Sequence, residues 1–189
     1  MRTPRACRAA RAGLAFCFAL AAAVCAPAIA SARNARALPS EPAQVAFSAG
    51  AFDVLQHDRA FEGRLEYRAG QRIWRFRPFG GLMATSDSAA YVYAGLMLDL
   101  YLDDATGPGW VVSLGVAPGL FDHGNGLDLG HTVEFREQVE AGYRFTDDSR
   151  LALSLSHMSN AGLGGHNPGE ESLMLTYALP VARLLSSRR

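Results

Sequence analysis

The sequence predicts an all-β protein: an eight-stranded antiparallel up-and-down transmembrane β-barrel of the bacterial outer membrane. Three observations support this fold class. The chain begins with an export signal, the remainder alternates apolar and polar residues with a period of two, and about eight such segments are separated by turn sequences. A period of two indicates strands rather than helices.

Residues 1–32 have the three-part pattern of a secretory signal peptide. Four arginines precede an apolar run from Gly13 to about Ala26, and small residues at Ala28-Ile29-Ala30 or Ala30-Ser31-Ala32 offer cleavage sites. The apolar run is shorter than the roughly 20 residues that a transmembrane helix needs. We therefore expect the leader to be removed.

Removal of the leader changes the chemistry of the chain. Cys7, Cys17 and Cys25 all lie in it, so the mature protein has no thiol for a disulfide, a nucleophile or a zinc site. The charge becomes mildly acidic, because 18 − 4 = 14 basic residues face 18 acidic ones, and no basic patch suggests nucleic acid. A polar, proline-containing stretch at 33–44 is typical of a linker, and residues 45–189 suffice for one barrel domain.

The predicted strands follow one another with a turn signal after most of them. The segment at 45–55 alternates weakly, whereas 59–69 places Phe61 and Leu65 on one face with Glu62 and Arg64 on the other. The segment at 73–85 is bounded by Ala69-Gly70-Gln71 and Ser86-Asp87-Ser88. The remaining segments, separated by runs rich in Asp, Gly, Asn and Ser, are 89–102, 109–121, 132–145, 150–159 and 171–181. No convincing helix is predicted after the leader.

A membrane barrel and a soluble lipocalin-like barrel differ in which face of the strands is apolar. The strands are about ten to thirteen residues long, as tilted membrane strands are. The polar faces of 61–69 and 132–145 carry both charges, which suits pairing inside a small lumen. Several aromatic residues are expected to form interfacial girdles: Tyr67, Trp74, Tyr91, Tyr93, Trp110, Tyr143 and Tyr177. These features favour the membrane barrel, and the soluble periplasmic carrier stays as an alternative.

The segment LSLSHMS places two chemically active side chains on an apolar face. Leu153 and Leu155 share that face with His157 and Ser159, whose Cα atoms are expected roughly 6.5 to 7 Å apart. A serine esterase needs a base beside its nucleophile and a carboxylate to hold that base in the correct tautomer. His157 and Ser159 are therefore candidates for base and nucleophile.

The next strand supplies the carboxylate by the same count. Glu171 shares a face with Leu173 and Leu175, while Glu170 points to the other side. If the two leucine faces coincide, Glu171 lies beside His157, and replacing Glu170 should be nearly silent. The connecting loop is rich in Gly, Asn and Pro, and its backbone N–H groups or the Asn160 amide could donate to an oxyanion.

Other polar residues are assigned no chemistry. His166 is expected to be a solvated loop residue. The spacing of Asp122, His123, Asp128 and His131 matches no compact ligand pattern, so we expect no metal and no organic cofactor.

The run HMSNAGLGGHNPGEES resembles the motif of the outer-membrane lipid A 3-O-deacylases (PagL type), and LGHTVEFREQVEAGYRF resembles the strand before it. The likeness is specific over 129–180. It implies an eight-stranded barrel with Ser159 as nucleophile, His157 as base and Glu171 as orienting acid on the outer wall. The residues implied to shape the oxyanion loop are Asn160, Gly162, Asn167 and Gly169.

The activity implied is hydrolysis of the ester-linked 3-hydroxyacyl chain at position 3 of lipid A, without a metal or organic cofactor. The expected partners are lipopolysaccharide as substrate and outer-membrane lipid, with no nucleic acid and with a homodimer left open. With both termini periplasmic, the loop before Glu171 is extracellular and the site lies at the outer leaflet. A non-catalytic outer-membrane barrel with a structural or binding role is the alternative.

Overall fold

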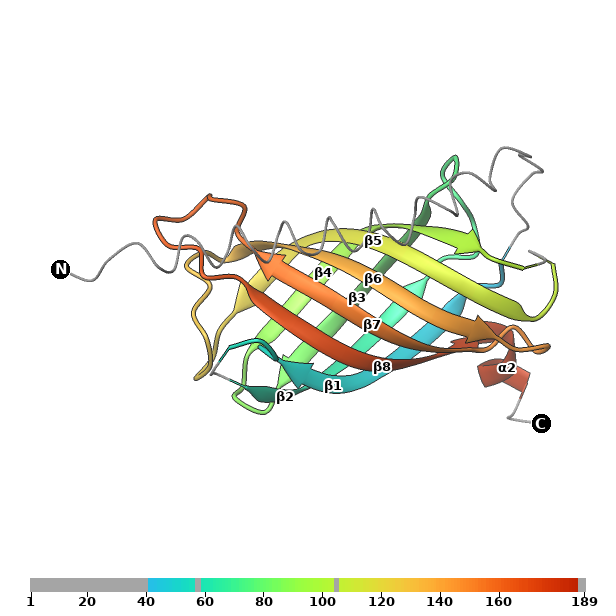
Figure 1. The fold of residues 1–189 in the computed structure, drawn as a ribbon, viewed down its shortest axis with the longest axis horizontal. Coiled ribbons are helices and arrows are strands. Elements are labelled where there is room, and N and C mark those ends of the chain that lie inside the picture. The colour runs from blue at the N-terminus through green and yellow to red at the C-terminus, as the bar shows by residue number, and fades with distance from the viewer. Residues whose placement is uncertain (1–40, 57–58, 104–105, 187–189) are drawn as a thin grey trace.

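A computed structural model of the 189-residue chain describes residues 41–56, 59–103 and 106–186. The predicted signal peptide at 1–32, and the linker up to residue 40, lie outside the described residues. Eight strands form a closed antiparallel barrel in which each strand pairs with its neighbours in the chain and β1 pairs with β8 (Figure 1). The strands are β1 (Gln44–Phe52), β2 (Ala60–Arg68), β3 (Arg77–Thr85), β4 (Ala90–Tyr101), β5 (Gly109–Asp122), β6 (Val133–Arg144), β7 (Arg150–Ser159) and β8 (Glu170–Pro180).

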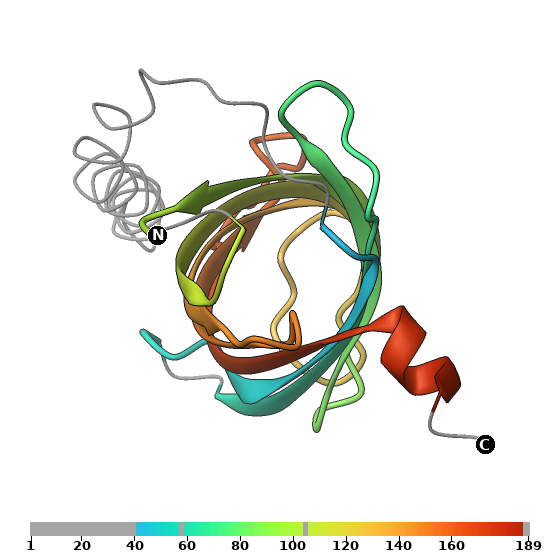
Figure 2. The same cartoon turned by 90° about the vertical axis from the view of Figure 1, so that its right-hand side faces the viewer.

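The barrel is polar inside and apolar outside, as in a transmembrane barrel and opposite to a lipocalin. Figure 2 looks along the barrel from the end that carries α2 (Val181–Ser186) and shows the strands surrounding a lumen. Leucines of β7 and β8, such as Leu153 and Leu175, are exposed on the outer wall. The charges predicted for a polar face are buried inside, including Glu62 and Arg64 of β2. The prediction of an eight-stranded membrane barrel is confirmed.

Opposite charges pair across the lumen. Arg68 of β2 donates to both carboxylate oxygens of Glu140 on β6, at 2.8 Å each. Arg136 of β6 donates to Glu66 of β2 at 2.7 Å and lies 3.8 Å from the ring centre of Tyr93. Charged side chains can be buried this deeply because each is paired with a partner of opposite charge.

Tyr91 and Tyr93 correct one sequence prediction. Both were expected in an outer girdle, yet they are 2% and 4% exposed and point into the lumen. The Tyr91 hydroxyl lies 2.9 Å from the carbonyl oxygen of Ala117 and 3.0 Å from that of Glu134, and the Tyr93 hydroxyl donates to Glu66. β4 is apolar on both faces near these residues, so alternation alone did not show which face was internal. Tyr67, Trp74, Trp110 and Tyr177 are exposed, as predicted.

The strand predicted at 45–55 ends at Phe52, and two further features differ from the prediction. The segment predicted to start at 73 becomes a strand only at Arg77, because Ile73 and Phe76 close a tight turn in which Trp74 has a φ of 58°. The expectation of no helix after the leader is wrong, since α2 follows β8 directly. Pro180 has no N–H to continue the strand ladder, and Val181–Ser186 contains good helix formers. Within the described ranges, no helix has the length and apolarity needed to cross a membrane.

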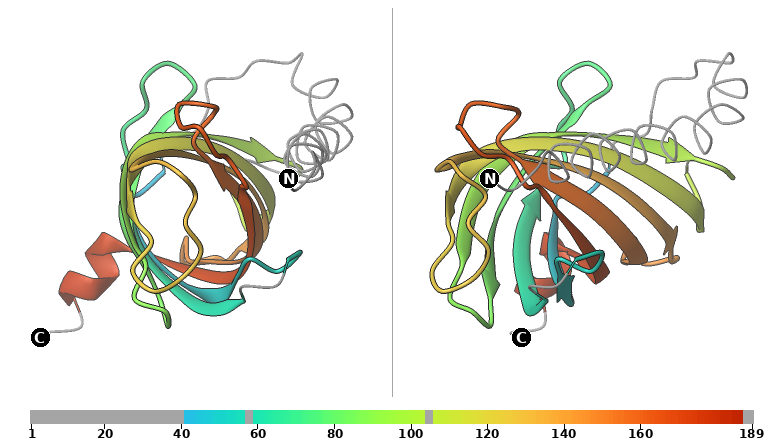
Figure 3. Two further views of the ribbon diagram at one scale, coloured as in Figure 1. Left: turned by 90° about the vertical axis from the view of Figure 1, so that its left-hand side faces the viewer. Right: turned by 60° about the vertical axis from the view of Figure 1, so that its left-hand side comes forward.

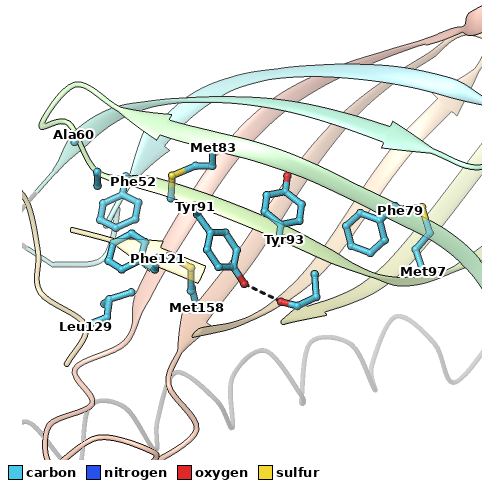
Figure 4. Packing of buried hydrophobic residues seen from close by; sticks show 12 residues of the cluster. Phe52, Ala60, Phe79, Met83, Tyr91, Tyr93, Met97, Phe121, Leu129 and Met158 are labelled. Atoms are coloured by element: carbon cyan, nitrogen blue, oxygen red, sulfur yellow. Dashed lines mark hydrogen bonds between the residues drawn. The ribbon is translucent and has the colours of Figure 1, made fainter. Parts of the chain in front are cut away.

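The two ends of the lumen are closed by different chemistry. At the end near α2, the buried Glu41 pairs with Arg77, Arg144 and Arg150. At the opposite end, the loop between β5 and β6 crosses the barrel mouth (Figure 3). Its Leu129 is fully buried in a cluster with apolar and aromatic side chains of several strands (Figure 4). This second end carries the candidate site.

Candidate active site

The predicted site lies where β7 ends and β8 begins, at the barrel end opposite α2. The loop at 160–169 connects the two strands and projects from the barrel in Figure 1. Cross-strand pairing places His157 directly opposite Glu171 and Met158 opposite Glu170. The leucine faces of the two strands therefore coincide, and Glu171 rather than Glu170 accompanies His157 on the outer wall.

His157 and Glu171 are in contact. Nδ1 of His157 lies 3.2 Å from Oε1 of Glu171, and the two residues are 2% and 8% exposed. A carboxylate oxygen only accepts hydrogen bonds, so this contact places the imidazole proton on Nδ1. Nε2 then keeps its lone pair and can act as a base.

Ser159 is two residues beyond His157 on the same face of β7 and is 7% exposed. It pairs in register with Phe135 of β6. The three predicted site residues thus share the outer face of β7 and β8 and are buried, and a side-chain contact within this set joins His157 to Glu171.

The loop after β1 and the loop at 160–169 meet beside the His157–Glu171 pair. The Gln56 side chain donates to the Gly169 carbonyl at 3.1 Å, and the Val54 N–H donates to the Glu171 carbonyl at 2.8 Å. Sequence reasoning missed Gln56 and Val54, because nothing in a period-two pattern shows which loop folds over which strand. These contacts tie the loop after β1 to the site.

Gly169 packs against the His157 ring. Its φ is +70°, and a Cβ at this position would lie 2.7 Å from Cε1 of His157 and 3.4 Å from Nε2. Gly162 also has a positive φ, of +86°. Both positions favour glycine for its backbone freedom, and Gly169 also requires it for close approach.

Asn160 is the residue that ties the loops together. Its side-chain amide donates to the carbonyls of Leu129 at 2.8 Å and His166 at 2.7 Å, and its Oδ1 accepts from the Gly162 N–H at 2.9 Å. The Asn160 backbone N–H donates to Oδ1 of Asn167 at 3.1 Å. The amide that the sequence offered to an oxyanion is therefore engaged in holding the loop, as is that backbone N–H.

The residues weighed for a metal serve local turns. Asp122 accepts from the Gly124 N–H, Asp128 accepts from the Gly130 N–H, and Nδ1 of His131 accepts from the Val133 N–H. Among residues 41–56, 59–103 and 106–186, no group of three His, Cys, Asp or Glu residues is arranged to hold a metal ion.

Curated relatives share part of this sequence. The lipid A deacylase PagL of Pseudomonas aeruginosa is 29% identical over 122 residues, which cover 63% of this chain and 67% of that protein. The lipid A deacylase PagL of Bordetella bronchiseptica is 31% identical over 74 residues, or 38% of this chain and 42% of that protein. The matched region thus spans less than half of the Bordetella protein.

A solved structure and a family model give the same assignment as these relatives. The crystal structure of the outer membrane enzyme PagL superimposes with a TM-score of 0.59 at 19% identity, covering 73% of this chain and 99% of that one, which supports the barrel architecture. The family model described as lipid A 3-O-deacylase (PagL) matches residues 58–180, from before β2 to the end of β8. The chain belongs to the lipid A 3-O-deacylase (PagL) family.

Proposed function

We propose that this protein is a serine esterase of the outer membrane that hydrolyses the ester-linked 3-hydroxyacyl chain at position 3 of lipid A. Ser159 is the nucleophile, His157 the general base and Glu171 the acid that orients it. The observation that carries the proposal is the paired His157–Glu171 contact of 3.2 Å, with Ser159 on the same strand face. Membership of the lipid A 3-O-deacylase family supports the substrate class.

The reaction takes two steps. In the first, Nε2 of His157 removes the proton from the Ser159 hydroxyl as its oxygen attacks the ester carbonyl carbon. The tetrahedral intermediate collapses, the bond to the sugar oxygen breaks, and His157 returns the proton to that oxygen. Glu171 stabilises the imidazolium that exists between these transfers.

In the second step, water hydrolyses the acyl-serine. His157 removes a proton from the water, the hydroxide adds to the acyl carbon, and Ser159 leaves with the proton restored. The products are a 3-hydroxy fatty acid and lipid A with a free hydroxyl at position 3. The engaged amide of Asn160 favours other N–H groups of loop 160–169 as oxyanion donors.

The outward position of the site suits a lipid substrate. His157 and Glu171 continue the stripe formed by the exposed leucines Leu153 and Leu173. With the termini on the periplasmic side, the β7–β8 loop is extracellular and the site lies at the level of the outer leaflet. An acyl ester of lipid A can then reach Ser159 from within the membrane.

Mass spectrometry of lipid A tests this function. Cells that produce the protein should lose one hydroxyacyl chain from lipid A, and Ser159→Ala, His157→Ala or Glu171→Ala should reduce this loss by a factor on the order of 10³ or more. Ser154→Ala is the matched control, because Ser154 lies on the same strand and faces the lumen. Heat-modifiable migration in gels would verify that each barrel is folded. Full activity of purified Ser159→Ala protein would refute the mechanism.

A further inference from the structure

A hydrogen-bonded chain of buried groups lies in the lumen directly behind His157 and Glu171. Its centre is Ser172, whose Oγ lies 2.5 Å from Oε2 of Glu62 and 2.9 Å from Oε2 of Glu170. The three residues have no exposed surface. Glu62 also forms an ion pair with Arg64.

The two contacts of Ser172 require an extra proton. A serine hydroxyl has one hydrogen, so it can donate to only one of the two carboxyl groups. The other carboxyl group must carry a proton and donate it to the Ser172 oxygen. Two buried carboxylates sharing one arginine would otherwise repel each other at a large desolvation cost.

Glu170 is the better holder of this proton. Glu62 forms an ion pair with Arg64, whereas Glu170 forms no ion pair with any residue that the structure describes. The groups that face Glu170 include Glu62 and Arg64 from β2, Tyr91 from β4, Ser172 on its own strand and the Asp53 backbone just after β1. The arrangement is therefore Glu170 donating to Ser172, Ser172 donating to Glu62, and Glu62 paired with Arg64.

The same chain contacts both strands of the candidate active site. Nη2 of Arg64 donates to the Ser156 hydroxyl of β7 at 2.9 Å, while Glu62 accepts from Ser172 of β8. Ser156 and Ser172 are cross-strand partners, and the next pair along the ladder is His157 with Glu171. β2 is not a neighbour of β7 or β8, so these contacts span the lumen.

We propose that Glu170 is a neutral, protonated positioning residue that completes this chain and so holds His157 and Glu171 in register. The catalytic part of this proposal rests on the proposed function. The position of the proton is independent of it. Parity along β8 predicted that replacing Glu170 would be nearly silent; the contacts of its side chain lead to a different expectation. Since a displacement of about 1 Å can cost about 10²-fold in rate, the support behind a catalytic pair matters.

Infrared spectroscopy of the folded, full-length protein tests the proton directly. A protonated carboxyl group has a carbonyl stretch distinct from that of a carboxylate. Glu134 on β6 is a second buried carboxyl group, and neither of its oxygens has a hydrogen-bond partner within the described part of the chain, so both spectra are recorded in a Glu134→Gln background. We expect the spectrum of this background at neutral pH to contain the band and the spectrum with Glu170→Gln added to lack it. A background spectrum without the band, or a band that persists after Glu170→Gln, overturns the proposal.

Kinetics with a short, soluble ester test the positioning role. Glu170→Ala should lower kcat about tenfold and leave KM within about twofold, because it disturbs alignment and not substrate contact. Glu170→Gln should restore kcat, since its amide N–H can donate to Ser172 in place of the carboxyl proton. The matched control is Glu140→Ala, which removes another buried lumenal carboxylate, the partner of Arg68.

The outcomes separate the two proposals. A Glu170→Gln enzyme as slow as Glu170→Ala, or a Glu170→Ala enzyme with wild-type kcat, refutes the positioning role. Activity that survives in Ser159→Ala refutes the proposed function instead, and the infrared band still decides where the proton resides. If Glu170→Ala does not fold, Glu170→Gln serves as the test: loss of the infrared band with wild-type kcat supports the proposal, and a persisting band or a lowered kcat refutes it.

Discussion

At the residue scale, Gly169 shows what the sequence could predict and what it could not. Period-two counting placed His157, Ser159 and Glu171 on one face, and the register pairs His157 with Glu171. The family resemblance marked Gly169 as part of the loop. It did not reveal the contact with the His157 ring, because loop paths depend on tertiary packing that has no sequence period.

Replacing Gly169 by alanine should impair catalysis. Alanine at a φ of +70° costs roughly 1 to 2 kcal/mol, and its Cβ would push against Cε1 of His157. We expect ester hydrolysis to fall by about tenfold or more, beyond what the modest loss of Tm explains. Gly165→Ala is the control, since a Cβ at Gly165 meets no atom within 4 Å. Equal activity of the two variants in a detergent assay would contradict this role.

At the element scale, the strands were predictable and the loops between them were not. The bounds of β7 (Arg150–Ser159) equal the predicted 150–159, and those of β6 (Val133–Arg144) differ from 132–145 by one residue at each end. The ends of a strand with one apolar and one polar face can be predicted, because the alternation stops where the strand ends. The loops after β5 and β7 join through Asn160, a partnership between positions 31 residues apart that alternation does not encode.

Asn160→Ala should loosen both loops. The change removes the donors to Leu129 and His166 and leaves two carbonyls without these partners, a cost of about 1 to 3 kcal/mol for each buried group. Limited proteolysis should cut the loop at 123–132 faster, and the rate of ester hydrolysis should decline because Ser159 adjoins the loosened segment. Asn125→Ala, an exposed change in the same loop, should alter neither. Wild-type resistance to protease in Asn160→Ala would show that the loops are held by other contacts.

At the scale of the whole molecule, the sequence predicted a charged lumen but not its pairing. Alternating Glu and Arg along β2 and β6 indicated two faces of opposite character. Which charge meets which depends on strand stagger around the closed barrel, so the Arg68–Glu140 pair could not be read from either strand alone. For the same reason Glu41, placed in a linker by its sequence context, was not foreseen as a lumenal residue.

Glu41 makes the stability of the barrel dependent on pH. Burial opposes its charge, but Arg150, together with Arg77 and the Tyr101 hydroxyl, holds the pKa of this carboxyl below its usual value. A lowered pKa in the folded state contributes stability above the unfolded value, about 4.3, and this stability is lost as pH falls through the folded pKa. Between pH 7 and pH 3, Tm should therefore fall more for the wild type than for Glu41→Gln. Equal decreases in Tm would show that protonation of Glu41 does not change the stability of the barrel.

The inward charges of β2 also bear on how the barrel enters the bilayer. A lone β2 inserted in hydrocarbon would keep the Arg68–Glu66 pair of its own strand, but the second partners of these two charges, Glu140 and Arg136, belong to β6, about 70 residues later in the chain. An arginine whose charge is incompletely matched near the midplane costs up to about 2 to 4 kcal/mol. Insertion strand by strand is thus unfavourable. The chain must bring its strands together and close the ring as it crosses the membrane, so that translocation and folding are one event.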